Sequence, residues 1–218
     1  MNARKFTVFA LVAFVLAAFG LGAYLYQERV QSSQMDKVTQ HPLRLVRMHS
    51  PVMGPQAAPV TIVEFFDPAC ETCRAFYPVV KDLMARYPTE VRLVIRYAPF
   101  HQGSDQVVLL LEAARRQNLY VPVLEAMLAA QPQWADHGRP DIRIAFQAAE
   151  QAGLNMAKAI EDARKPEVAA VLRQDIEDLT ALEVTRTPTF FVNGRSLPSF
   201  GREQLTALVA EEVAKARK

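Results

Sequence analysis

The chain has 218 residues, half of them hydrophobic, and a formal net charge of +2 from 25 basic and 23 acidic side chains. This composition excludes a chain that is disordered over most of its length, and the interspersed charges form no basic face of the kind that binds nucleic acid. With an N-terminal apolar segment and its tether set aside, roughly 160 to 170 residues remain, which is enough for one domain with a core.

The first predicted element is an uncharged segment over residues 6–26, which Arg4 and Lys5 precede. A helix of this length crosses a bilayer at about 1.5 Å of rise per residue. Basic residues in front of it favour a cytoplasmic N-terminus and export of the remainder. We therefore expect residues 1–5 in the cytoplasm and a transmembrane signal-anchor at residues 6–26.

Cleavage of this segment as a signal peptide is the alternative, since Gly20-Leu21-Gly22 offers a poor small-x-small site. The domain would then be soluble after export. Both routes deliver it to an oxidising compartment, in which disulfides persist. Residues 27–58 follow as a predicted tether, because polar residues dominate its start and prolines interrupt its end. Residues 43–48 give a weak signal for a short edge strand.

From residue 59 to residue 218 the pattern predicts one α/β domain. Residues 60–66 and 91–97 are apolar runs that are typical of buried strands, and residues 74–87 between them carry an apolar helical stripe. Strand, helix and strand in this order predict a right-handed βαβ unit.

The next part of the chain, about residues 104–182, is predicted to be a helical insertion. The hydrophobic period indicates helices near residues 104–117, 121–130, 141–152, 155–163 and 167–182. The period then changes. Residues 189–192 predict a strand, Asn193-Gly194 a type I′ hairpin turn, residues 195–197 the return strand, and residues 201–217 a closing helix.

The two cysteines of the chain, Cys70 and Cys73, stand at the start of the first predicted helix of this domain. The loop between them is too short to stabilise a fold much as a disulfide, so a chemical role is favoured. A helix N-terminus stabilises a thiolate, which makes Cys70 the expected attacking thiol and Cys73 the buried resolving thiol. The alternative, half of a zinc site, needs a second ligand pair. The four histidines lack the required spacing, so we predict no metal site.

Three further residues stand out near these cysteines in the predicted fold. Glu64 interrupts an apolar strand, and a buried carboxyl with a raised pKa can carry the proton of Cys73; the alternative is an edge carboxylate in solvent. His101 follows the second strand and is within reach of the sulfurs, although a loop histidine is more often only polar surface. Pro188 begins the hairpin strand, and since about 5–6% of X-Pro bonds are cis, physics alone predicts a trans bond.

Two stretches of the chain resemble a known family. Residues 65–73, Phe-Phe-Asp-Pro-Ala-Cys-Glu-Thr-Cys, with Pro78 after them, resemble the active-site helix of thioredoxin-fold proteins. The helical insertion and residues 187–194, Thr-Pro-Thr-Phe-Phe-Val-Asn-Gly, narrow the resemblance to the DsbA-like thiol:disulfide oxidoreductases of bacteria, over about residues 58–216. The resemblance implies an α/β thioredoxin-like fold with an inserted all-helical subdomain and an enzyme that needs no cofactor.

The resemblance also implies roles for individual residues. Cys70 becomes the exposed nucleophile and Cys73 the resolving cysteine of a redox-active disulfide. Glu64 matches the buried acid of the family, and Pro188 matches the cis-proline beside the disulfide. The backbone of Thr187 would pair with an extended substrate segment as an added strand.

The dipeptide between the cysteines departs from the strongly oxidising members of the family, which carry Pro-His there. This chain has Glu71-Thr72, residues that would also face the substrate. Glu71 adds negative charge near the thiolate, and a less stable thiolate makes a weaker oxidant. Thr187 before the proline also resembles the isomerase and reductase branches. We therefore expect a redox poise less oxidising than that of the Pro-His type.

The function expected from these patterns is thiol:disulfide exchange by a single-pass protein of the bacterial inner membrane whose C-terminal domain faces the periplasm. Its expected partners are exported proteins with thiols or disulfides and a membrane redox partner that recycles the dithiol. Two alternatives stay open. One is a disulfide reductase or isomerase for a dedicated client, and the other is a non-enzymatic copper or zinc carrier that uses both thiolates.

Overall fold

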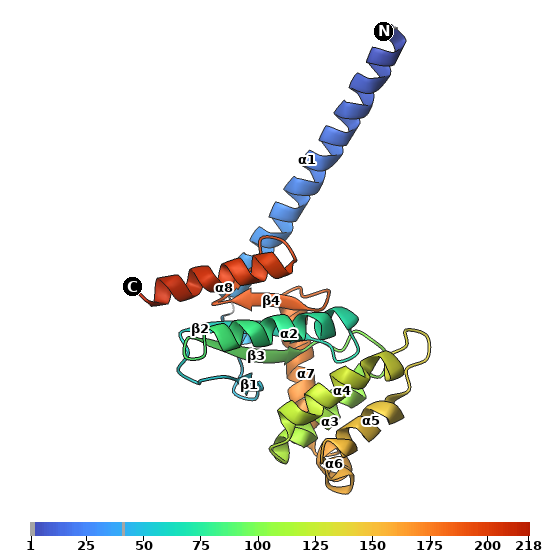
Figure 1. Ribbon diagram of the computed structural model, residues 1–218, viewed down its shortest axis with the longest axis vertical. Coiled ribbons are helices and arrows are strands. Elements are labelled where there is room, and N and C mark those ends of the chain that lie inside the picture. The colour runs from blue at the N-terminus through green and yellow to red at the C-terminus, as the bar shows by residue number, and fades with distance from the viewer. Residues whose placement is uncertain (1–2, 41) are drawn as a thin grey trace.

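A five-stranded mixed sheet forms the centre of the molecule (Figure 1). The computed structural model describes residues 3–40 and 42–218. The strand order is β1-β3-β2-β4-β5; β2 and β3 pair in parallel, and the other neighbours are antiparallel. The strands are β1 (Val52–Met53), β2 (Val60–Phe66), β3 (Val91–Tyr97), β4 (Thr189–Val192) and β5 (Arg195–Ser196).

Helices cover both faces of the sheet, so β2 and β3 are buried almost throughout. Side chains of a strand alternate between its two faces. Ile62 and Phe66 of β2 pack into a core with α2 (Glu71–Arg86) and α8 (Arg202–Ala216). Val63 and Phe65 pack into a second core on the opposite face, which contains the end of α7 (Pro166–Ala181). The βαβ unit, β2-α2-β3, has the strand bounds and the parallel pairing that the sequence predicts, whereas α2 begins at Glu71 and not at the predicted residue 74.

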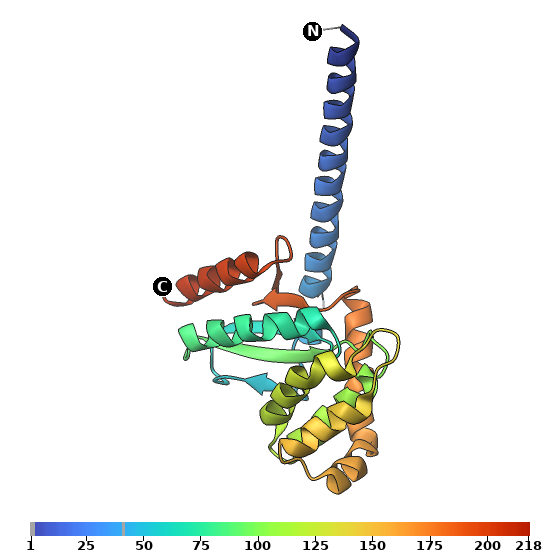
Figure 2. The same cartoon turned by 45° about the vertical axis from the view of Figure 1, so that its right-hand side comes forward.

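The predicted helical insertion is present between β3 and β4, and it comprises α3 to α7. These helices are α3 (Ser104–Arg116), α4 (Tyr120–Trp134), α5 (Ile142–Gln151), α6 (Met156–Ala163) and α7. Figure 2 shows them grouped beside one end of the sheet, with α4 close to the start of α2. Trp134 at the end of α4 is fully buried, and its Nε1 donates a hydrogen bond to the carbonyl of Met127 at 2.9 Å.

The return hairpin also agrees with the sequence. Asn193 and Gly194 have φ values of 47° and 82°, and positive φ at both central residues defines the type I′ turn. The turn joins β4 to β5 in an antiparallel pair. The closing helix α8 then runs back over β2 and β4.

The N-terminal part of the chain differs from the expectation. Helix α1 (Ala3–Gln40) continues through residues 27–40, which were predicted as the start of a tether, and it projects away from the sheet (Figures 1 and 2). The edge strand lies at Val52–Met53 and not at residues 43–48; a short 3-10 helix (Pro42–Arg44) begins that segment instead. In the part of the chain that the structure describes, no helix has the length and hydropathy of a membrane span.

An ionic cluster explains why residues 43–48 do not join the sheet edge. The fully buried Arg96 of β3 bonds Asp175 and Asp178 of α7, each at 2.7 Å. Arg47 reaches Asp178 at 2.7 Å, and His49 Nε2 lies 2.7 Å from Asp175. Burial acts to raise the pKa of Asp178, but the two arginines lower it below its usual value. The cluster therefore holds this segment against α7, with Asp178 in its charged form.

Candidate active site

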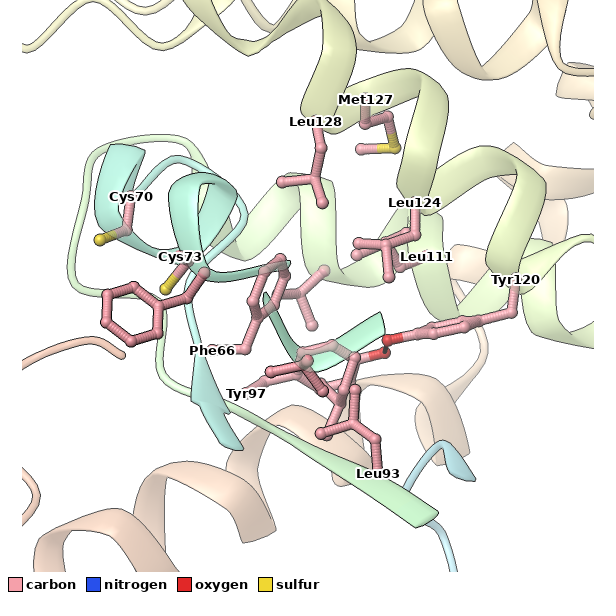
Figure 3. Close-up of a cluster of buried hydrophobic side chains, with 14 of the residues drawn as sticks. Phe66, Cys70, Cys73, Leu93, Tyr97, Leu111, Tyr120, Leu124, Met127 and Leu128 are labelled. Carbon is pink, nitrogen blue, oxygen red and sulfur yellow. Dashed lines mark hydrogen bonds between the residues drawn. The ribbon is translucent and has the colours of Figure 1, made fainter. Parts of the chain in front are cut away.

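The two cysteines lie where β2 turns into α2. Cys70 is the N-cap residue of α2, in extended conformation, and both thiols are free. The backbone N–H of Cys70 donates to the carbonyl of Asp67 at 3.1 Å, and the carbonyl of Cys70 accepts the first helical bond from Arg74. In Figure 3 both sulfurs point to the same side of the first turn of α2, beside Phe66. A dithiol is therefore presented at a helix N-terminus, as its spacing predicts.

The environments of the two thiols move their pKa values apart. The pKa of Cys70 falls from 9.0 to about 5, chiefly because the Cys73 thiol donates a hydrogen bond to its sulfur. The Thr187 side chain and two backbone N–H groups lower this pKa further, whereas burial acts to raise it. Burial and the same hydrogen bond raise the pKa of Cys73 well above its usual value. At neutral pH Cys70 is a thiolate and Cys73 is a thiol.

Cys70 is less accessible than the resemblance implies. Its residue exposure is 5%, against none for Cys73. The reason lies in the loop before β4, since the carbonyl of Thr187 stands 3.4 Å from the Cys70 sulfur.

Glu64 is a buried acid on the central strand and not an edge carboxylate. Its exposure is 1%, and β2 lies between β3 and β4. Among the described residues, no hydrogen-bond partner is found for its Oε1 atom. Burial and, to a smaller extent, the charge of Cys70 raise the pKa of Glu64 to about 8, and its charge acts in turn on Cys73. The carboxyl is therefore mostly protonated at neutral pH.

The structure brings the remaining predicted site residues to the same place. The Thr187–Pro188 peptide bond is cis, as the resemblance implies and against the expectation from physics alone. Pro188 is buried and Thr187 is half-buried beside Cys70. Glu71 and Thr72 are exposed on the first turn of α2, so they face solvent on the side from which a substrate would come.

Asp67 lies at this site, although no local sequence pattern singles it out. It is fully buried. Its Oδ1 atom accepts from the backbone N–H of Ala69 at 2.9 Å and from the Ser104 hydroxyl. Its Oδ2 atom accepts from the backbone N–H groups of Phe100 and His101 at 2.7 and 2.9 Å. Asp67 thus joins the active-site turn to the loop after β3, a long-range contact for which the local sequence holds no signal.

Two histidines lie near the dithiol although neither stands between the cysteines. His101 Nδ1 lies 2.7 Å from Asp67 Oδ2, and the rings of His101 and His137 are 5.6 Å apart. Burial acts to lower the pKa of His101, but the hydrogen bond and charge of Asp67 raise it, with a contribution from the charge of Cys70. His137 Nε2 pairs with Glu71 at 2.8 Å.

The residues that the structure describes contain no group of three His, Cys, Asp or Glu side chains arranged to hold a metal ion. The dithiol therefore has no neighbouring third ligand among them. The chemistry available at this site is that of the two sulfurs, the Glu64 carboxyl and the backbone of the Thr187 loop.

Known proteins that resemble the chain share its fold. The thioredoxin-like oxidoreductase of Silicibacter pomeroyi DSS-3 is 29% identical, with a TM-score of 0.68 over 80% of this chain and 96% of that chain. The thiol-disulfide exchange protein alpha-DsbA2 of Wolbachia pipientis has a TM-score of 0.70 over 84% of this chain and 97% of that one, but at 16% identity it supports the fold alone.

A curated relative carries a different name. The Na(+)/H(+) antiporter NhaA 3 of Salinispora tropica is 34% identical over 170 residues, which cover 76% of this chain and 25% of the antiporter. The chain spans about a quarter to a third of the length of the curated relatives it matches. Their transport activity therefore does not carry over to this chain.

The match to a family agrees with the fold and the site. The sequence model of the family described as Thioredoxin matches residues 47–211, which include every strand, the helical insertion and both cysteines. The chain belongs to the thioredoxin family.

Proposed function

We propose that this protein exchanges disulfides with exported proteins through the Cys70–Cys73 pair. The observation that carries the proposal is the placement of the two thiols, with Cys70 at the N-cap of α2 and Cys73 fully buried one turn later. In keeping with this placement, the pKa of Cys70 is lowered to about 5 and that of Cys73 is raised. A thiolate attacks and leaves far more readily than a thiol. The pair therefore has one sulfur that forms the bond to the substrate and one that resolves it.

In the oxidising direction, a substrate thiolate attacks the Cys70 sulfur of the disulfide form. The Cys70–Cys73 bond breaks, the Cys73 sulfur leaves as a thiolate, and it takes a proton from the Glu64 carboxyl. A second substrate thiolate then attacks the substrate sulfur of the mixed disulfide, and Cys70 leaves as a thiolate. Two electrons have moved from the substrate to the protein, and a membrane redox partner accepts them when the dithiol is recycled.

In the reducing direction the same atoms act in reverse. The Cys70 thiolate attacks a substrate disulfide, and one substrate sulfur leaves. The Glu64 carboxylate then accepts the proton of Cys73, whose thiolate attacks Cys70 and releases the reduced substrate. General-base help of this kind typically contributes about 10²- to 10⁴-fold in rate. The roles of Cys70, Cys73 and Glu64 are thus the same for an oxidase, a reductase or an isomerase.

We assign substrate contact to the loop before β4. The Thr187 carbonyl lies 3.4 Å from the attacking sulfur, so an extended segment that pairs with the Thr187 backbone would place its own sulfur next to Cys70. Pro188 fixes the course of this loop. Glu71 and Thr72 are exposed on the first turn of α2 and would contact the residues that flank the substrate cysteine.

The redox poise is the first testable consequence. A Cys70 pKa of about 5 lies between about 7 for thioredoxin and about 3.5 for DsbA. We expect an equilibrium with glutathione that is less oxidising than that of the Pro-His type and more oxidising than that of thioredoxin. Titration of the thiolate absorbance and a glutathione redox equilibrium measure both quantities. A thiolate as acidic as in Pro-His members, together with a potential as high, would contradict this expectation.

We also propose that residues 6–26 anchor the protein in the inner membrane with the domain in the periplasm. The support is a helix whose large apolar side chains are exposed, namely Val8, Phe9, Leu11, Val12, Phe14, Val15, Leu16, Phe19 and Leu21. We expect the protein to stay in the membrane fraction after alkaline carbonate extraction, with an intact mass that begins at Met1. A soluble periplasmic form that begins near residue 23 would show cleavage after Gly22 instead.

A further inference from the structure

The helical insertion contacts the active-site turn through one buried amide. Gln131 of α4 is 1% exposed. Its Nε2 atom donates to the carbonyl of Pro68 at 2.8 Å and to the carbonyl of Cys70 at 3.1 Å. Its Oε1 atom accepts from Arg74 Nε at 2.8 Å. Both hydrogens of the amide nitrogen and the amide oxygen are therefore engaged with the segment that carries Cys70.

The backbone at this point lacks the usual means of fixing a helix start. Cys70 is the N-cap residue of α2, and its side chain makes no capping hydrogen bond. A missing side-chain cap leaves the first turn of a helix less stable. The Asp67 side chain accepts from the N–H of Ala69, and the Asp67 backbone carbonyl accepts from the N–H of Cys70. Gln131 donates to the carbonyls of Pro68 and Cys70. The two residues secure the same turn through opposite backbone groups.

The position of this turn matters for the attacking sulfur. The backbone N–H groups of Thr72 and Cys73 act to lower the pKa of Cys70, and both belong to the first turn of α2. Their directions depend on the rotation of that turn about the helix axis. A shift of the Cys70 carbonyl would move the sulfur away from these donors, because carbonyl and side chain share one α-carbon.

We propose that Gln131 is a positioning residue that holds the backbone around Cys70 so that the N–H groups of Thr72 and Cys73 face its sulfur. The helical insertion thereby sets the reactivity of the dithiol, beyond its part in covering the sheet. In Figure 3, Leu124 and Leu128 of α4 point into the same core as Phe66 and Cys73, so α4 offers a rigid base for the amide. The inference rests on the proposed function only in taking Cys70 as the attacking thiol.

The side chain at this position needs two donors and one acceptor at the length of glutamine. Methionine has nearly the same shape but cannot make any of the three bonds, and asparagine keeps the amide but is shorter by one methylene. We expect Gln131→Met to raise the pKa of Cys70 by about one unit, a tenfold loss of thiolate at a pH between the two values. A less stable thiolate shifts the glutathione equilibrium about tenfold toward the oxidised protein.

The matched control is Gln133→Met, which makes the same change two residues further along α4 at an exposed position. It should leave both the Cys70 pKa and the glutathione equilibrium unchanged. Thermal unfolding of each variant separates a folded protein with altered chemistry from one that is merely unstable. Gln131→Asn should change the pKa in the same direction, and it decides the question if Gln131→Met does not fold.

The outcomes separate the inference from the proposed function. A folded Gln131→Met or Gln131→Asn variant with the wild-type pKa and equilibrium would overturn the positioning role, and the glutamine would then serve only the packing of α4. An ordinary thiol pKa for Cys70 in the wild-type protein would instead contradict the proposed function. A raised pKa in the Gln131 variants, with no change in Gln133→Met, supports the inference.

Discussion

Replacing Cys73 with serine is expected to convert the protein into a trap that accumulates mixed disulfides through Cys70. The Cys70 thiolate still attacks a substrate disulfide, but the resolving sulfur is gone, so the adduct persists. Replacing Cys70 with serine removes the attacking thiolate, and the raised pKa of Cys73 leaves that sulfur protonated and buried. The rate of insulin reduction should then fall by several orders of magnitude, toward the uncatalysed background.

The measurement is a thiol-trapped, non-reducing gel of whole cells that express each variant, followed by mass spectrometry of the adducts. The double variant Cys70→Ser/Cys73→Ser serves as the control for non-specific association. Adducts should appear with Cys73→Ser alone. If they accumulate only with Cys70→Ser, the roles of the two sulfurs are reversed. If neither variant forms adducts, a metal-carrier role gains support, and titration of the reduced protein with copper or zinc tests it.

The elements that local pattern determines could be predicted from the sequence. The bounds of β2 and β3 follow from two apolar runs, and the type I′ turn follows from Asn193-Gly194, which tolerates positive φ at both positions. The helical insertion follows from hydrophobic period alone. The cysteine spacing, combined with the predicted strand before it, indicated the redox site, because a thiolate needs the helix N-terminus that this order supplies.

The features that depend on distant contacts could not be predicted. Residues 43–48 were expected at the sheet edge, but buried ion pairs with α7 hold them elsewhere. The role of Asp67 has no local signal, because the His101 backbone and the Ser104 hydroxyl that it bonds lie 34 and 37 residues further along the chain. The same holds for Gln131, which lies about sixty residues from the turn that it bonds. A polar side chain in an apolar helix signals that a partner exists, but spacing does not identify the partner.

The cis bond before Pro188 illustrates a different limit. Backbone energetics favours trans at any X-Pro position, so only the resemblance to a family indicated the cis form, which the structure has. Conversely, the resemblance implied an exposed Cys70, but the Thr187 loop lies against its sulfur and covers it. The local geometry of this chain thus refines the expectation that the family gives.

Replacing Glu64 with glutamine is expected to slow thiol:disulfide exchange by about 10²-fold near neutral pH, because Cys73 loses its proton donor and acceptor. The glutamine keeps the shape of the side chain but does not titrate. In the wild-type protein the exchange rate should change with pH near 8, the pKa to which burial raises Glu64, and the variant should lack this step. Stopped-flow kinetics of mixed-disulfide resolution between pH 6 and pH 9, a range of about one to two units around that pKa, measures both effects.

The same substitution is expected to stabilise the fold. A carboxyl with a pKa of about 8 in the folded state and 4.5 in the unfolded state binds its proton more tightly when folded. Its contribution to stability is therefore present below pH 4.5 and is lost as the pH rises toward 8. At pH 7 the loss is at most about 3 kcal/mol, at 1.4 kcal/mol per pKa unit. In urea unfolding of the reduced proteins, the free energy of unfolding of Glu64→Gln should exceed that of wild type by an amount that grows as the pH rises across this range.

The comparison with wild type matters because Cys70 titrates in the opposite sense. Its pKa is lowered from 9.0 to about 5, so its contribution is present above pH 9 and is lost as the pH falls toward 5. Cys70 is present in both proteins, so the difference between their free energies of unfolding cancels most of its effect.

Glu112→Gln is a matched control, since Glu112 is also buried with a raised pKa but bonds Tyr97 and Arg115. Glu112→Gln should destabilise the protein and leave the exchange rate unchanged. If Glu64→Gln exchanges disulfides at the wild-type rate, Glu64 has no part in the mechanism.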